Sequence, residues 1–286
     1  MRPLVSRKAG VIQWMILGLV GSAVCLASPA MAACTEEGED NCIDWEKGVA
    51  YAVGTGAPAP WLKDPGQKNI SARRAAKLDA ARNLLELIKG TQVSSSTTLE
   101  NRMASSDSVR VSVEGRLQNL RVVGKEKYFS DGTIQVRVAA SLREVVPADA
   151  LMDNTPPAAW KDPSRVKGDV DTSQTYTGLV IDARGLELIP AMSPRVVDPS
   201  GQEVYSAAFV TREYAVNQGV VGYAKKLEKA TASERVKGNP LVIKAKASTG
   251  QTRTDLVLEA ADADALRRLA QTQNFMRECR VIFLLD

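Results

Sequence analysis

One stretch decides the fold of the first half of the chain: residues 71–89, with the sequence SARRAAKLDAARNLLELIK. At 3.6 residues per turn, the larger apolar residues share one face of a helix and the charged residues occupy the other. That apolar face consists of Leu78, Ala81, Leu84, Leu85 and Ile88. Ser71 is placed to cap the start of the helix, and Gly90 follows where a helix stop is expected. The alanines near the start would let this helix lie close to a sheet.

The segments around this helix predict strands. Residues 48–54 form a short apolar run, and residues 108–114 alternate strictly between valine and polar residues, as a half-buried strand does. Residues 120–123 continue the sheet, and a hairpin turn at residues 130–132 leads into a return strand with Ile134, Val136 and Val138. The order strand, helix, strand, strand indicates one long helix packed on an antiparallel sheet.

The second half alternates short strands with helices, which is typical of a mixed α/β domain. Residues 176–185 form an apolar strand that ends in a polar turn, and residues 198–201 form a hairpin turn. Further expected elements are a partly helical segment at 212–229, strands at 241–247 and 255–258, a helix at 263–272 and a terminal strand, buried on both faces, at 281–285. The fold class is therefore α+β with two small domains.

Composition divides the chain into a leader, two domains and a linker. Residues 147–172 contain several prolines and keep no apolar period, which is typical of a linker. The first domain then covers residues 33–146, and the second covers residues 173–286. The length that remains after residue 32 fits one to two domains at about 150 residues each.

The first 32 residues have the pattern of an export signal. Arg2, Arg7 and Lys8 form a basic start, residues 11–26 form an apolar stretch, and Ser28–Ala32 ends in an A-x-A cleavage pattern. The apolar stretch is shorter than the roughly 20 residues of a spanning helix. Removal of these three basic residues and of no acidic one lowers the net charge from +4 to +1. We expect a periplasmic location, and a nearly neutral mature chain gives no support for binding to nucleic acid or to a membrane surface.

A second processing route is open at the same site. Met31-Ala32-Ala33-Cys34 resembles a bacterial lipobox, in which Cys34 would carry a lipid and anchor the protein in the outer membrane. We favour plain cleavage after Ala32, because Met31 stands where a lipobox prefers leucine and a proline-containing polar segment precedes it. The mass of the mature N-terminus distinguishes the two routes.

Three cysteines remain after cleavage: Cys34, Cys42 and Cys279. Export places them in an oxidising compartment. We predict a Cys34–Cys42 disulfide, because the short acidic loop between the two residues closes at little cost, and we expect Cys279 to be a buried free thiol. If Cys34 is lipidated, Cys42 and Cys279 become the remaining intramolecular pair. Metal binding by three scattered cysteines without histidine is a poor alternative.

The first domain resembles a known family. Residues 72–86 (ARRAAKLDAARNLLE), followed by Ile88, Gly90 and Val93 and then by Tyr128-Phe129 and Asp131-Gly132, resemble the LPP-twenty-type bacterial lipoprotein domain and the N-terminal domain of the flagellar assembly protein FlgT. The resemblance covers roughly residues 43–142, and the run 176–185 with the chain end resembles the second domain of exported FlgT-like proteins. It implies an envelope location and a role in protein interaction.

The chain contains no histidine, which excludes catalytic pairs and metal or haem sites that use imidazole. Residues 54–59 satisfy the dinucleotide pattern G-x-G-x-x-A, but Pro58 and Pro60 stand where the helix that receives the pyrophosphate would begin. Residues 164–167 match the S-x-x-K of Ser/Lys acylases, yet they lie in the predicted linker without the partner motif. We therefore predict no enzyme activity, no cofactor and no metal site.

Asp182 and Arg184 are the charged pair to which the pattern draws attention. They lie at the end of a predicted interior strand, where α/β folds place ligand sites. The alternative, which we favour, is an ion pair or a turn carboxylate without a binding role. A basic helix face is expected to be solvated or to meet an acidic partner, and it comprises Arg73, Arg74, Lys77 and Arg82.

Together these features predict a non-catalytic, exported envelope protein that acts as an assembly or interaction module. The expected partners are envelope proteins, such as flagellar basal-body or outer-membrane components. The alternative is a periplasmic small-ligand-binding module that uses Asp182 and Arg184. The sequence leaves the oligomeric state open.

Overall fold

The computed structural model describes residues 34, 37–38, 40–152, 156–160, 162 and 170–286, apart from the side chain of Asn119. The predicted export signal and the S-x-x-K motif at 164–167 lie outside the described residues. From Cys34 onward the chain forms one unit, which contains two main hydrophobic cores. Among the described residues, no helix combines the length and the apolar character needed to cross a membrane.

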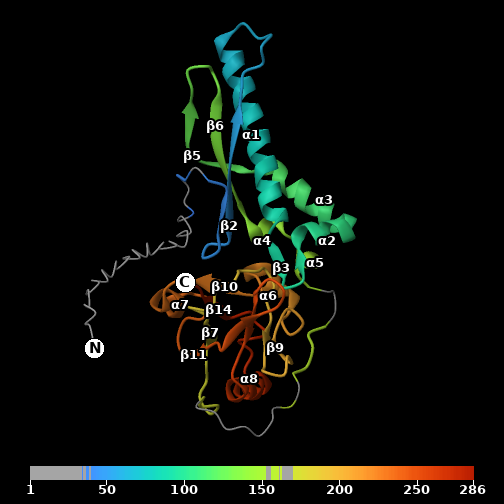
Figure 1. The fold of residues 1–286 in the computed structure, drawn as a ribbon, viewed down its shortest axis with the longest axis vertical. Coiled ribbons are helices and arrows are strands. Elements are labelled where there is room, and N and C mark those ends of the chain that lie inside the picture. The colour runs from blue at the N-terminus through green and yellow to red at the C-terminus, as the bar shows by residue number, and fades with distance from the viewer. Residues whose placement is uncertain (1–33, 35–36, 39, 153–155, 161, 163–169) are drawn as a thin grey trace, which may run out of the picture. The chain divides into compact units, whose positions relative to one another are not determined.

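The N-terminal half is built on a four-stranded antiparallel sheet with the strand order β1-β2-β6-β5. Its strands are β1 (Cys42–Asp44), β2 (Val49–Gly56), β5 (Arg121–Tyr128) and β6 (Ile134–Ser141). The long helix α1 (Pro65–Lys89) covers one face of β2 and β6 (Figure 1). The predicted hairpin joins β5 to β6. The α+β class, with one long helix packed on an antiparallel sheet, is confirmed.

Helix α1 packs on the sheet through three alanines in its first part and through larger apolar residues toward its end. Its buried side chains recur every four residues and are Ala72, Ala76, Ala80, Leu84 and Ile88. The backbones approach so closely that a Cβ added to Gly54 would lie 2.0 Å from the Ala80 nitrogen, and one added to Gly56 would lie 2.2 Å from the Ala76 nitrogen. The two glycines of the G-x-G-x-x-A pattern therefore permit helix packing.

The start of α1 differs from the prediction, and so does part of its buried face, although Leu84 and Ile88 are buried as predicted. Asp64 caps the helix, because its Oδ1 accepts a hydrogen bond from the Gln67 nitrogen (2.8 Å), and Pro65 occupies the first helical position. Ser71 lies inside the helix, where its hydroxyl accepts a hydrogen bond from the Ala59 nitrogen (3.1 Å). Leu78, which the periodicity places in the core, is 64% exposed.

The predicted strand at residues 108–114 is wrong, because this segment lies in helix α3 (Asp107–Arg116). Val109 and Val113 are buried one helical turn apart, whereas Val111 is 65% exposed. The side chain of Ser106 caps the helix by accepting a hydrogen bond from the Val109 nitrogen (3.4 Å). A valine at every second position satisfies a strand, but the outer two also satisfy the four-residue spacing of a helix.

Short elements complete the N-terminal half. A two-stranded ribbon and helix α2 precede α3, and a 3₁₀ turn η1 follows it. These elements and two further short helices are β3 (Gln92–Ser94), β4 (Thr97–Thr98), α2 (Leu99–Ser105), η1 (Leu117–Asn119), α4 (Leu142–Val145) and α5 (Ala148–Leu151). Helix α5 falls within the predicted linker, and its Ala150 is fully buried.

The C-terminal half contains two four-stranded sheets. One is parallel, has the order β10-β14-β7-β11, and consists of β7 (Gly178–Asp182), β10 (Gly222–Ala224), β11 (Pro240–Lys244) and β14 (Val281–Leu284). The other is mixed, has the order β12-β13-β8-β9, and consists of β8 (Val196–Val197), β9 (Glu203–Tyr205), β12 (Ala247–Thr249) and β13 (Asp255–Val257). The helices are α6 (Arg212–Gln218), α7 (Leu227–Ala232) and α8 (Ala260–Thr272).

Most of the predicted elements of this half are present. The terminal strand β14 is buried at all four positions, between β10 and β7. The hairpin turn at residues 198–201 joins β8 to β9. The segment 212–229 is partly helical, as predicted: it contains α6 and the start of α7, which the short strand β10 separates. Gly219, with φ of +76°, ends α6 in a conformation that favours glycine.

Candidate functional site

An apolar groove runs beside the exposed flank of α1. It has a volume of about 300 Å³, and α1, η1 and the sheet contribute its apolar lining. We call this feature the α1 groove, and its apolar lining consists of Leu78, Ala81, Leu85, Leu117, Leu120 and Val138. Leu78 is the most exposed of these residues, while Leu85 and Leu120 are half-buried.

Charged and polar side chains surround this apolar lining. Lys77 and Arg82 project from α1, and Glu114 and Gln118 stand on the opposite wall, all four being exposed. An apolar centre with a polar rim is the usual composition of a protein-interaction surface. The groove is therefore suited to binding an apolar side chain or a helix by shape and apolar contact.

The fold holds both walls of the α1 groove in place. The alanine face packs α1 against the sheet so closely that no side chain fits between the two backbones at Gly54 and Gly56. On the opposite wall Leu117 is buried, and the nearby Arg116 donates a hydrogen bond from Nη1 to the Glu144 carbonyl oxygen (2.8 Å). The apolar stripe that contains Leu78 is thus presented to solvent by a rigid support.

Sequence reasoning identified the residues of this stripe but missed the groove. The pattern of residues 71–89 contains two apolar stripes, one of alanines and one of leucines, and a single sheet covers only one of them. Residues 71–89 contain more apolar positions than one sheet can cover, and this excess was the signal in the sequence that a second apolar surface would be exposed. The second wall could not be foreseen, because residues 108–114, which lie in α3, were expected to form a strand.

Asp182 and Arg184 lie together at the carboxyl end of β7, as an ion pair with each other. The Asp182 carboxylate accepts hydrogen bonds from Arg184 Nε (2.8 Å) and Nη2 (2.6 Å) and from the Arg184 backbone nitrogen (3.1 Å). The hydrogen bonds from the Arg184 side chain lower the pKa of Asp182 despite its partial burial. Because each charge already neutralises the other, this geometry favours the ion-pair interpretation over a ligand site.

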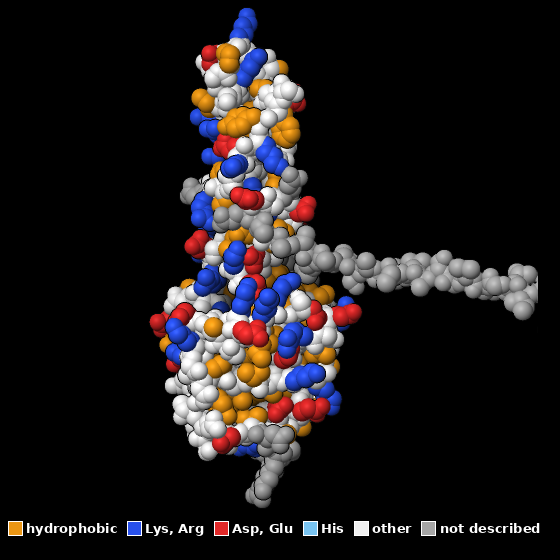
Figure 2. All heavy atoms as spheres, turned by 90° about the vertical axis from the view of Figure 1, so that its left-hand side faces the viewer, with side chains coloured by type: hydrophobic (Ala, Val, Ile, Leu, Met, Phe, Trp, Pro, Cys, Tyr) orange, Lys and Arg blue, Asp and Glu red, His pale blue; other side chains and the backbone are white. Residues whose placement is uncertain are grey.

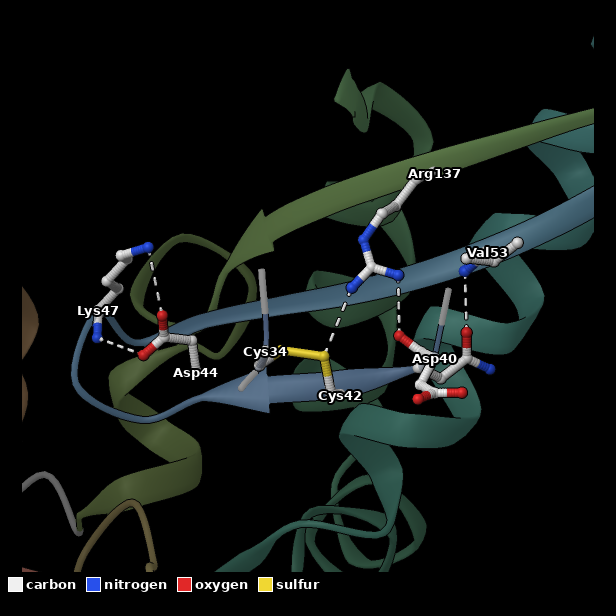
Figure 3. Close-up of a disulfide and its surroundings, with 8 residues drawn as sticks. Cys34, Asp40, Cys42, Asp44, Lys47, Val53 and Arg137 are labelled. Carbon is white, nitrogen blue, oxygen red and sulfur yellow. Dashed lines mark hydrogen bonds and ion pairs between the residues drawn. A yellow bond between two sulfur atoms is a disulfide. The ribbon is translucent and has the colours of Figure 1, made fainter. Parts of the chain in front are cut away.

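The structure pairs Cys34 with Cys42 in a disulfide, which confirms the predicted pairing. The bridge lies over the sheet close to Arg137 of β6, which is 5% exposed (Figure 3). The guanidinium of Arg137 donates to the Asp40 carbonyl oxygen (2.8 Å) and to Cys42 Sγ (3.4 Å), and it stacks 5.1 Å from the ring centroid of Tyr51. Burial lowers the pKa of Arg137. The arginine therefore ties the disulfide loop to the sheet.

The remaining described cysteine, Cys279, is a buried free thiol, as predicted. Burial raises its pKa to about 12, so the thiol stays protonated and has little nucleophilic character. Within the described ranges, no three histidine, cysteine, aspartate or glutamate side chains come together in a way that could hold a metal ion.

Comparison with family models matches the C-terminal half of the chain. Residues 178–286 match the family model described as the second domain of Treponema pallidum Tp0624. No curated protein matches the chain. The matched region begins at the first residue of β7 and contains the whole parallel sheet, but it is less than half of the chain. The C-terminal half is therefore similar to this Tp0624 domain.

Proposed function

We propose that this protein is an exported, non-catalytic interaction module of the bacterial envelope that binds a partner protein in the α1 groove. The observation that carries the proposal is an apolar groove beside a helix that packs closely on the sheet, with the exposed Leu78 at its edge and the half-buried Leu85 and Leu120 in its lining. Leu78 leaves 64% of its surface in water, and its neighbours provide an apolar lining deep enough to receive a partner side chain. Contact with a partner would remove this apolar surface from water.

Two features support the exported location. The leader pattern of residues 1–32 is that of a cleaved signal, and the Cys34–Cys42 disulfide is a bond of oxidising compartments. The disulfide also bears on the alternative of a lipid anchor. A diacylglyceryl group would be attached through Cys34 Sγ, and one sulfur atom cannot hold both that thioether and the disulfide. The disulfide therefore supports a periplasmic protein without a lipid on Cys34.

The resemblance of residues 43–142 suggests the class of partner. The LPP-twenty and FlgT-like domains imply assembly on envelope structures, so basal-body and outer-membrane proteins are the first partners to test. The exposed Lys77 and Arg82 at the rim favour a partner segment that carries carboxylates beside its apolar residues.

The proposal is tested by capture of partners from envelope fractions with the exported, affinity-tagged protein. We expect Leu78→Asp to reduce recovery of the partner at least tenfold, because a carboxylate in the groove would have to be desolvated. The matched control is Val242→Asp, which changes a 45% exposed side chain on β11. Equal recovery by wild type and Leu78→Asp, with both folded by circular dichroism, would contradict the proposal.

A further inference from the structure

The start of α1 and the end of the β5–β6 hairpin form a second exposed apolar surface, separate from the α1 groove. We define this tip as residues 57–74 and 125–133. Trp61 is 78% exposed, Tyr128 56% and Phe129 49%. Among the described residues, these are the exposed aromatic side chains, and Ile70, at 55% exposure, adds an aliphatic one.

Contacts between distant parts of the chain hold the tip together. A Cβ added to Gly132 would lie 3.3 Å from Pro58 Cγ, so the hairpin turn lies against the loop before α1. Arg73 of α1 donates a hydrogen bond to the Tyr128 hydroxyl (2.8 Å) and forms an ion pair with Glu126 (2.9 Å). The aromatic residues of the loop and the hairpin therefore belong to one surface.

The tip is basic, although the mature chain is nearly neutral. It contains six basic residues, namely Lys63, Lys68, Arg73, Arg74, Lys125 and Lys127, against three acidic ones. The acids have local structural partners: Asp64 caps α1, Glu126 pairs with Arg73, and Asp131 accepts a hydrogen bond from the Thr133 nitrogen (2.9 Å). The tip thus has a net charge of +3. Because the expected mature chain has a net charge of +1, the remainder has a net charge of −2.

We propose that the tip docks on the surface of an anionic lipid bilayer. Tryptophan and tyrosine favour the bilayer interface, and lysine and arginine are attracted to anionic headgroups while their alkyl stems cover apolar surface. The tip presents this combination on a loop, a helix start and a hairpin turn, and Figure 2 shows basic and hydrophobic side chains interspersed at its upper end. The opposite charge of the remainder would orient the tip toward the membrane.

The choice of a bilayer over an acidic protein rests on how the apolar residues are arranged. In the α1 groove, apolar residues line a concavity that fits one partner segment. At the tip, Trp61, Ile70 and Phe129 are exposed on three separate segments, a loop, the start of α1 and a hairpin turn, which suits a flat, fluid surface that adapts to each of them. A protein partner would instead need a matching set of pockets.

The test is co-sedimentation of a chain that begins at Ala33 with phosphatidylcholine vesicles, with and without phosphatidylglycerol. This start removes the apolar residues 11–26, which would bind lipid by themselves. We expect binding that requires phosphatidylglycerol and weakens as salt is raised. The double variant Lys63→Glu/Lys68→Glu should bind at least about 25-fold more weakly, at about fivefold per lysine.

Trp61→Ser tests the aromatic contact. On anionic vesicles, the tryptophan fluorescence of wild type should shift to shorter wavelength, and this shift should be lost in Trp61→Ser. Matched controls are Val216→Ser, at a 49% exposed position on α6, and Lys226→Glu/Lys244→Glu, at two exposed lysines of the C-terminal half. Both should bind as wild type does. The proposal is overturned if wild type does not sediment with anionic vesicles, or if the tip variants bind as tightly as the controls.

Discussion

Gly54 of β2 packs directly against the backbone of α1, and Gly54→Ala tests this contact. The added Cβ would lie 2.0 Å from the Ala80 nitrogen and 2.4 Å from the Ala76 carbonyl oxygen. Ordinary contact begins near 3.4 Å, so helix and strand would have to separate by about 1.4 Å. The obstructing atoms are backbone, so no side chain can turn aside to make room.

Such a separation would loosen the buried stripe of α1 along much of its length, because Ala72, Ala76 and Ala80 contact the same sheet. We expect Gly54→Ala to lower the free energy of unfolding by about 3 kcal/mol, at the upper end for overpacking a core. This corresponds to a fall of about 1 M in the urea midpoint at an m-value of about 2–3 kcal/mol/M. The assay is urea unfolding of the mature chain, followed by circular dichroism.

The matched control is Gly115→Ala in α3, where an added Cβ would meet nothing within 4 Å. Alanine favours a helix interior, so this variant should be more stable by about 0.5–1 kcal/mol. A Gly54→Ala protein with the wild-type urea midpoint would refute the close packing of α1 on β2.

Three further predictions follow from other parts of the structure. Helix α3 exposes Val111 and buries Val113. Val111→Glu should therefore change the free energy of unfolding by no more than about 0.5 kcal/mol, and Val113→Glu should lower it by about 3 kcal/mol. Equal losses in urea unfolding would restore the strand interpretation. Peptide mapping should give a Cys34–Cys42 linked peptide without lipid, and a lipid-bearing Cys34 peptide would contradict the disulfide. Because the two cysteines are 8 residues apart, reduction of the bridge should lower the free energy of unfolding by about 2.5 kcal/mol. Burial acts to raise the pKa of Asp198, but hydrogen bonds from Ser200 and Arg267 outweigh it and hold the pKa at about 2. This carboxylate therefore stabilises the fold at pH values above its ordinary pKa of 3.8, and its contribution is lost as the pH falls toward 2. Asp198→Asn should therefore flatten the acid limb of stability measured against pH, and an unchanged limb would show that other groups cause it.

Helix α1 shows what periodicity can predict and where it stops. Its existence and its end at Gly90 follow from spacing and from a helix stop. Its buried face follows only in part: Leu84 and Ile88 are buried as predicted, but Ala76 and Ala80 are buried where the ranking of residues by hydrophobicity favours Leu78. Gly54 and Gly56 remove the side chains opposite α1, so small residues pack there and Leu78 is left outside. The sheet against which α1 packs determines which face of the helix is buried. The sequence of α1 alone does not contain that information.

The segment 107–116 was misassigned because two periods fit the same valines. Val109 and Val113 are compatible with a strand at every second position and with a helix at every fourth. The capping serine at 106, followed by Asp107 in the first turn, was the signal for the helix. The disulfide partner of Cys34 was predictable from loop length, whereas the bond from Arg137 to the loop needed the sheet register that brings residues 97 apart together.

The basic tip could not be predicted from the net charge of the chain. Averaged over the mature chain, the charges nearly cancel, and this argued against a membrane surface as a partner. The fold concentrates basic residues of α1 and of the β5–β6 hairpin at one place, while most of the compensating acids lie elsewhere. Asp182 and Arg184 illustrate the reverse case: the sequence favoured an ion pair and left a ligand site as the alternative, and in the structure the two side chains bond to each other.

The central claim, that the α1 groove binds a partner protein, is tested most directly by placing a photo-crosslinking amino acid at position 78 in the exported protein. The same group at position 242 serves as the control, since both positions are exposed. Irradiation of intact cells should give an adduct with a specific envelope protein from position 78 and not from position 242, and Leu85→Asp in the same groove should abolish it. No adduct from position 78, or the same adducts from both positions, would contradict the proposed function.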